Sequence, residues 1–228
     1  MSDVLTLDLV DKDGAVREAL DEANRGTREQ LFRKAIIGGG AFVAGGLLIG
    51  GLPRLAAAQA PSAAQDTAIL NFALTLEYLE SEFYVDAVTK GALSGETLTF
   101  ARTVRDHELA HVEALKEALG SSAVAKPTFN FMNTTSDAAT FRATAVVLED
   151  TGVSAYNGQG PNLRKATLAV AAGIVSVEAR HASWIRRIVG KPDYDDTAAN
   201  YPAPAVLDPA LTRDEVLAAV TETGFITG

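Results

Sequence analysis

From residue 66 onward, apolar residues recur with the 3.6-residue period of amphipathic helices, and no segment alternates in the manner of a strand. This pattern predicts an all-α fold built on four long helices. We expect the helices at residues 66–90, 96–119, 137–156 and 162–189.

The connections between these segments predict how the helices are arranged. A few residues join the first helix to the second and the third to the fourth, which predicts two antiparallel hairpins. Residues 121–136 separate the two hairpins, and an extended chain of that length spans roughly 50 Å. A helix of 24 residues is about 36 Å long. We therefore expect a four-helix bundle with one long crossover connection.

Local signals refine the helix boundaries. Ser94 and Ser136 are candidate caps at the starts of the second and third helices. The pair Asn157-Gly158 is expected to end the third helix, and Pro161 suits the first turn of the fourth.

The N-terminal part resembles an export signal. Residues 35–52 carry no charge and include seven glycines, and Arg33 and Lys34 precede them. A basic pair, an apolar run and a following AAAQA predict a secretory signal peptide cleaved after Ala58, of twin-arginine type with Arg-Lys in place of Arg-Arg. If uncleaved, the segment could anchor the protein in a membrane. We expect an exported protein, located in the periplasm, in the cell wall or outside the cell.

These features divide the chain into three parts. They are a lead-in with signal peptide (1–58), a four-helix bundle (59–190) and a C-terminal tail (191–228). In the tail, Thr212 and Glu215 form a capping box for a short helix that ends near Val220. We expect Val216, Leu217 and Val220 to dock this helix on the bundle.

Composition narrows the possible chemistry. The chain has no cysteine, which excludes disulfides, thiol catalysis and cysteine-ligated metals. A metal must therefore be held by Asp, Glu and the three histidines, at positions 107, 111 and 181. The net charge of −9 argues against nucleic acid as a partner.

Each predicted helix carries a glutamate within an apolar stretch, where an unpaired carboxylate is costly to bury. In two helices a histidine follows three residues later, on the same face. The residues are Glu77, Glu108, His111, Glu149, Glu178 and His181. Four carboxylates and two imidazoles suit two divalent cations, whereas buried Glu–His pairs acting only as polar contacts are the alternative.

The two hairpins also echo each other. Glu77 is followed seven residues later by Tyr84, and Glu149 is followed seven residues later by Tyr156. The repeat predicts a pseudo-twofold site with six ligands. The two tyrosines could bond to ligand carboxylates, carry a radical or simply pack in the core.

The stretch from His107 to His111 has the sequence HELAH, which also fits the H-E-x-x-H pattern of zinc peptidases. That interpretation requires a third ligand and an edge strand, and it leaves Glu77, Glu149 and Glu178-x-x-His181 unexplained. We therefore favour the bundle site and interpret His107 as a residue at the surface or behind the ligands.

The segments ILNFALTLEYLESEFY, DHELAHVEAL, VLEDTGVSAY and VEARHASW resemble the ferritin-like di-iron carboxylate proteins, above all the secreted domains grouped with desiccation-related proteins. The resemblance implies a ferritin-like four-helix bundle in which Glu108 and Glu178 bridge two metals. It further implies that Glu77 and His111 complete one metal site and that Glu149 and His181 complete the other.

The resemblance leaves some positions open. Glu80 and Glu82 are rival ligands from the first helix. Some members of the family place an Asp directly before each Glu-x-x-His, where it can orient a ligating histidine. Here those positions hold His107 and Val177.

The resemblance also implies a function. We expect two divalent ions, iron first and manganese second, that react with O2 or H2O2 as in a ferroxidase or a peroxide-consuming enzyme. A non-catalytic, metal-stapled stress or desiccation protein is the alternative, and a dinuclear manganese catalase-like activity is a third possibility. We expect a monomer or homodimer rather than a hollow 24-mer.

Overall fold

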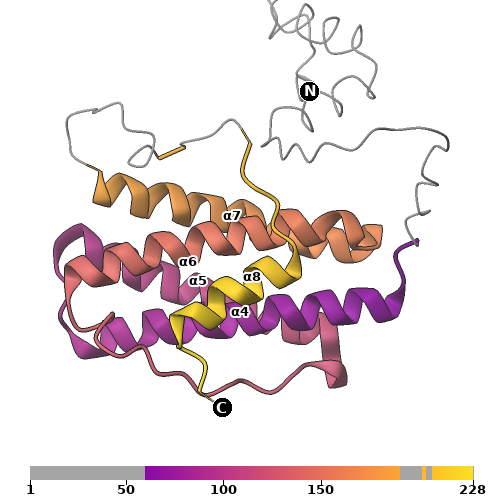
Figure 1. The fold of residues 1–228 in the computed structure, drawn as a ribbon, viewed down its shortest axis with the longest axis horizontal. Helices are drawn as coiled ribbons and strands as arrows, with labels where there is room; N and C mark the ends of the chain where they lie inside the picture. The colour runs from indigo at the N-terminus through magenta and orange to yellow at the C-terminus, as the bar shows by residue number, and fades with distance from the viewer. Residues whose placement is uncertain (1–59, 191–201, 204–206, 228) are drawn as a thin grey trace, which may run out of the picture. The chain divides into compact units, whose positions relative to one another are not determined.

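The computed structural model describes residues 60–190, 202–203 and 207–227. These residues form the helices α4 (Ala63–Lys90), α5 (Gly95–Leu119), α6 (Ala138–Gln159), α7 (Lys165–Val189) and α8 (Arg213–Thr223) (Figure 1). The described residues contain no strand and only one isolated bridge, between Phe129 and Ile226. The predicted all-α fold is confirmed, whereas the signal segment and its cleavage site lie outside the described residues. Among the described helices, none is long and apolar enough to cross a membrane.

The four long helices form two hairpins, as predicted. Residues 91–94 join α4 to α5, and Gly91 ends α4 in the left-handed region, with φ of 69°. Residues 160–164 join α6 to α7 and include the short 3-10 turn η2 (Gly160–Asn162). The hairpins then pack against each other, with α5 against α7 and α4 against α6.

The crossover occupies residues 120–137 and begins with the 3-10 turn η1 (Gly120–Ser122). It runs along the length of the bundle, so that α6 starts from the end at which α5 starts (Figure 1). Asn71 on α4 fixes its first part, because the Asn71 side chain donates to the Ser122 carbonyl at 2.9 Å and accepts from Val124 N at 2.9 Å. The one-crossover topology predicted from loop length is therefore confirmed.

The third and fourth helices differ from their predicted bounds. Asp137 caps α6, since its Oδ1 accepts from the backbone N–H groups of Ala139 and Thr140, each at 2.9 Å; Ser136 is not the cap. Helix α6 also continues past Asn157 to Gln159. The fourth helix begins at Lys165 and not at 162, because Pro161 lies in η2.

Gly158 lies inside α6 for a steric reason. A Cβ at this position would stand 1.8 Å from the carbonyl oxygen of Leu211 in the C-terminal tail. The tail can approach this closely because Gly158 has no side chain, and Leu211 N donates to the Ser154 carbonyl at 3.0 Å. Gly158, which was predicted to end the helix, instead allows the backbone of the tail to approach α6.

The C-terminal segment docks along the bundle through α8. The predicted capping box is present, with Thr212 and Glu215 exchanging hydrogen bonds. Val216 and Val220 are buried, as expected. Leu217 is 37% exposed, so the expectation that it helps to dock the helix is wrong. Beyond α8, Thr227 N donates to the Thr128 carbonyl at 2.9 Å, which attaches the tail to the crossover.

Two apolar clusters fill the bundle. One contains Phe83, Phe100, Phe141 and Ile185, and the other contains Leu74, Leu115, Leu163 and Ile174. Burying each large side chain contributes about 1.5–3 kcal/mol. Along α5 and α7, the acidic residue singled out by the sequence lies between the residues of one cluster and those of the other, whereas along α4 and α6 residues of the first cluster stand on both sides of it. The polar layer is therefore enclosed by apolar packing on both sides.

The docking of the tail predicts opposite effects for two glycine substitutions. Gly158→Ala should lower the free energy of unfolding by about 1–3 kcal/mol, because its Cβ would displace the backbone of Leu211. Gly173→Ala is the matched control within α7, where a Cβ meets nothing within 4 Å. It should raise stability by about 0.5–1 kcal/mol through helix propensity. Urea unfolding measures both; equal stability of Gly158→Ala and the parent chain would refute this path for the tail.

Candidate metal centre

The structure brings all six predicted side chains together. Their ligand atoms form two overlapping groups, in each of which the atoms lie within 4.8 Å of one another. One group is Glu77, Glu108, His111 and Glu178, and the other is Glu108, Glu149, Glu178 and His181. Every member is buried, and the four glutamates are fully buried. Glu108 and Glu178 belong to both groups, which is the arrangement expected of bridging ligands.

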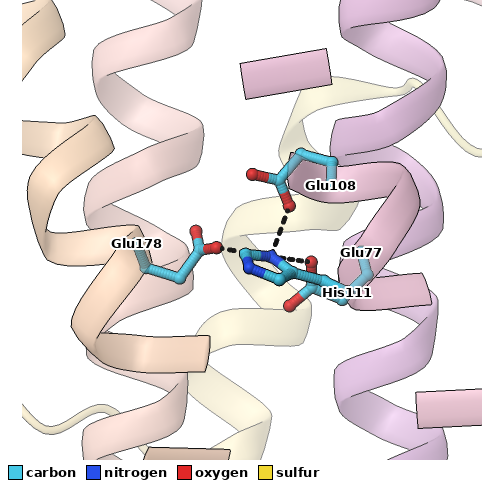
Figure 2. Close-up of side chains that lie close together, drawn as sticks. All are labelled: Glu77, Glu108, His111 and Glu178. Atoms are coloured by element: carbon cyan, nitrogen blue, oxygen red, sulfur yellow. Dashed lines mark hydrogen bonds and ion pairs between the residues drawn. The ribbon is translucent and has the colours of Figure 1, made fainter. Parts of the chain in front are cut away.

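The first group converges on His111, as Figure 2 shows. Its Nδ1 lies 3.3 Å from Glu77 Oε2, 3.2 Å from Glu108 Oε2 and 3.0 Å from Glu178 Oε1. These carboxylates come from α4, α5 and α7. One imidazole nitrogen thus faces three carboxylates from three different helices.

The second group repeats the pattern around His181. Its Nδ1 lies 3.0 Å from Glu108 Oε1, 3.4 Å from Glu149 Oε2 and 3.8 Å from Glu178 Oε1. Glu108 therefore turns one oxygen toward each histidine. The pseudo-twofold arrangement predicted from the repeated hairpins is the geometry observed.

Each tyrosine of the repeat bonds to the glutamate of the other hairpin. The Tyr156 hydroxyl donates to Glu77 Oε1 at 2.5 Å, and the Tyr84 hydroxyl donates to Glu149 Oε1. The second oxygen of each carboxylate is the one that faces its histidine. The tyrosines thus set the orientation of the two terminal glutamates, while their rings pack in the apolar clusters. Seven-residue spacing predicted the face of the helix, but not the exchange between hairpins.

His107 contacts the site from outside. Its Nδ1 lies 2.8 Å from His181 Nε2, and the two rings stack with centroids 5.1 Å apart. Because Nδ1 of His181 faces the carboxylates, Nε2 is the nitrogen that can donate to His107. An outer partner of this kind fixes the tautomer and orientation of a ligating histidine. Val177, at the equivalent position on α7, has an apolar side chain that offers no such bond.

This placement of His107 also bears on the HELAH pattern. Within the described part of the chain, His107 belongs to neither group of converging ligand atoms. It is exposed and faces the far nitrogen of His181. His107 and His111 therefore do not converge on one ion, as a zinc peptidase site requires.

Unsatisfied polar atoms mark the same place. Among the described residues, six buried side-chain nitrogen or oxygen atoms have no partner in hydrogen-bonding geometry, although His181 Nδ1 lies 3.0–3.8 Å from three of the oxygens. All six belong to this cluster and its neighbour Glu80: Glu80 Oε1, Glu108 Oε1, Glu149 Oε2, Glu178 Oε1 and Oε2, and His181 Nδ1. Buried polar atoms are almost always paired, so a set of orphans at one point calls for a bound species.

The charges of the cluster perturb its protonation. Burial, followed by the charge of Glu77, raises the pKa of Glu178 to about 8. Burial and the charge of Glu178 raise the pKa of Glu108 well above its usual range. Burial alone would lower the pKa of His111, but the carboxylates of Glu108, Glu178 and Glu77 around its Nδ1 raise it overall. Protons therefore occupy this cluster at neutral pH when no cation does.

The donor set suits divalent cations. Carboxylate oxygens and imidazole nitrogens are ligands for iron, manganese and similar ions. Four carboxylates carry four negative charges, which two divalent cations neutralise and two imidazolium groups only half neutralise. The cluster is therefore better matched to bound divalent cations than to Glu–His pairing alone.

The two rival acids of α4 lie in different surroundings. Glu82 bonds to Lys126 of the crossover at 2.5 Å and does not face the centre. Glu80, like Glu77, is buried, and it lies beside the centre. Only the position of Glu77 next to His111 and Tyr156 reproduces the pattern of Glu149.

Comparison with known proteins agrees with this geometry. A family model described as a ferritin-like domain matches residues 65–191, which span the four long helices and the cluster. A search of curated proteins finds no match to the chain.

The perturbed groups predict how stability changes with pH in chelator-treated protein. Glu178, Glu108, His111 and His181 all have pKa values raised by folding. Their contribution is present at low pH and is lost as pH rises through the folded pKa. Glu178 defines the window, because its pKa is raised from 4.5 to about 8. Tm should therefore fall between about pH 4.5 and 8, and saturating Mn²⁺ should reduce the fall by replacing protons. In Glu178→Gln the slope should be smaller; a flat profile for the parent chain would contradict this electrostatic account.

The contact with His107 predicts an effect on cation binding by the ligand group that contains His181. His107→Ala should lower the affinity for one of two cations by about 10–100-fold, the usual cost of removing the partner of a ligating histidine. His107→Asp should restore affinity, since a carboxylate can accept the same bond from His181 Nε2. Asp106→Ala, at the exposed neighbouring position, is the control. Calorimetric titration with Mn²⁺ measures all three, and equal weakening in the control would refute a specific role for His107.

Proposed function

Because this chain belongs to the ferritin-like domain family, we propose that it holds two divalent metal ions, foremost iron, in a centre that reacts with O2 or H2O2. The observation that carries this proposal is the pair of overlapping ligand groups that share Glu108 and Glu178. Shared carboxylates place two cations close enough to act on one small molecule, as in other two-metal sites.

Each residue has a defined part in this proposal. Glu108 and Glu178 would bridge the ions, and Glu77 with His111 and Glu149 with His181 would complete the two ends. The bonds from Tyr84 and Tyr156 hold the terminal carboxylates so that one oxygen of each faces inward. Two bound ferrous ions can supply one electron each to oxygen or peroxide. The apolar clusters on both sides exclude water from the reaction.

We further propose that this activity takes place outside the cytoplasm, as an exported or membrane-anchored monomer or homodimer. The basic pair Arg33-Lys34, the uncharged residues 35–52 and the following small residues support export. The partners would then be metal ions and O2 or H2O2, and the membrane would be contacted only through the N-terminal segment.

A structural role is the second candidate. The four glutamates are fully buried in the middle of the bundle, so cations that neutralise them would stabilise the fold without any turnover. Such a protein would serve as a stress or desiccation factor whose helical bundle is stabilised by bound metal. Manganese fits the same oxygen and nitrogen ligands, and a peroxide-dismutating centre would follow from it.

Anaerobic loading followed by oxidation distinguishes these functions. We expect two Fe²⁺ per chain by metal analysis, and consumption of O2 or H2O2 with appearance of ferric absorption on exposure. Glu178→Ala should lose at least one ion because both groups share this residue. Glu113→Ala, on the exposed face of α5, should behave like the parent chain. Two bound ions without turnover of either oxidant would favour the structural role, and two bound ions in Glu178→Ala would refute the ligand assignment.

A further inference from the structure

A further buried acidic side chain lies beside the centre, outside the two ligand groups. Glu80 is three residues after Glu77 on α4 and only 3% exposed. Its Oε1 has no hydrogen-bond partner, although the atom is fully buried. The six-residue pattern of the repeated hairpins does not include it.

Glu80 breaks the twofold repeat of the site. Glu77 and Tyr84 correspond to Glu149 and Tyr156, each 72 positions later in the chain. The same offset relates Glu80 to Gly152, which has no side chain. One hairpin therefore contributes an extra carboxylate where the other contributes nothing.

The missing side chain of Gly152 makes room for that carboxylate. A Cβ on Gly152 would lie 3.3 Å from Glu80 Oε1 and 3.2 Å from Glu178 Oε2. Both carboxylates thus face the same point at the surface of α6, and one of them, Glu178, is shared by both ligand groups. Because Glu80 and Gly152 are equivalent positions that approach each other, this point is near the pseudo-twofold axis.

An acid in this position is costly unless a cation neutralises it. An ionised carboxylate with neither a hydrogen bond nor a cation is strongly disfavoured in an apolar interior. Burial and the unpaired Oε1 together indicate that this carboxyl group needs a proton or a cation as partner.

We propose that Glu80 is a fifth carboxylate donor to the dinuclear centre, admitted by Gly152 and placed beside Glu178. This inference rests on the proposed metal-binding function. With five carboxylates, two divalent ions leave one negative charge, whereas one divalent and one trivalent ion give neutrality. Glu80 would therefore make the centre asymmetric and favour a trivalent ion within it.

Equilibrium binding of Co²⁺ to the full chain tests this role without any turnover. Glu80→Gln keeps the shape and removes the charge, and Glu82→Gln on the same helix, paired with Lys126, is the matched control. In Glu80→Gln, calorimetry should show that the affinity for one of two Co²⁺ ions is lower by about tenfold or more. The visible absorption of bound Co²⁺ should change as well, whereas Glu82→Gln should match the parent chain.

Two further measurements separate a donor from a structural acid. Chelator-treated Glu80→Gln should be at least as stable as the parent chain, because a buried acid has been removed. Gly152→Ala should weaken Co²⁺ binding in the same direction as Glu80→Gln, since its Cβ would crowd both Glu80 Oε1 and Glu178 Oε2. Two Co²⁺ ions bound by Glu80→Gln with unchanged affinity and spectrum would overturn this proposal alone. A parent chain that binds no Co²⁺, Mn²⁺ or Fe²⁺ would overturn the proposed function together with it.

Discussion

The burial of four carboxylates at one level of the bundle is the constraint on which the rest of the structure depends. Glu77, Glu108, Glu149 and Glu178 are fully enclosed, and apolar clusters lie on both sides of them. Withdrawing each charge from water costs several kcal/mol, which hydrogen bonds, opposite charge or protons must offset. The placement of the histidines, the raised pKa values and the proposed affinity for cations all follow from that arrangement.

The sequence predicted the helices, the two hairpins and the crossover, because periodicity and loop length are local properties. It also predicted which six side chains converge, because a glutamate in an apolar stretch is too costly to bury without a partner. It could not predict that His107 reaches His181, since that contact depends on how α5 and α7 are rotated relative to each other. Likewise, Asp137 rather than Ser136 caps α6, although both are good caps and adjacent in the chain.

Membership of a family and possession of a function rest on different observations. The family match and the helical bundle establish the fold, but one fold carries many activities. The proposed chemistry rests instead on side chains that converge within hydrogen-bonding distance. Both departures from twofold symmetry, His107 opposite Val177 and Glu80 opposite Gly152, make the two halves of the centre inequivalent. Inequivalent halves allow two ions to differ in affinity and in charge.

The exchange of tyrosine hydrogen bonds has a consequence for how such a site can arise. Tyr84 donates a hydrogen bond to Glu149 and Tyr156 donates one to Glu77, so neither of these two glutamates is oriented by the tyrosine of its own hairpin. A lone ancestral helix pair would contain every residue type needed, yet could form none of these bonds within itself. Two identical copies meeting face to face would form both at once. Fusing them into one chain would then preserve each contact and free the copies to diverge.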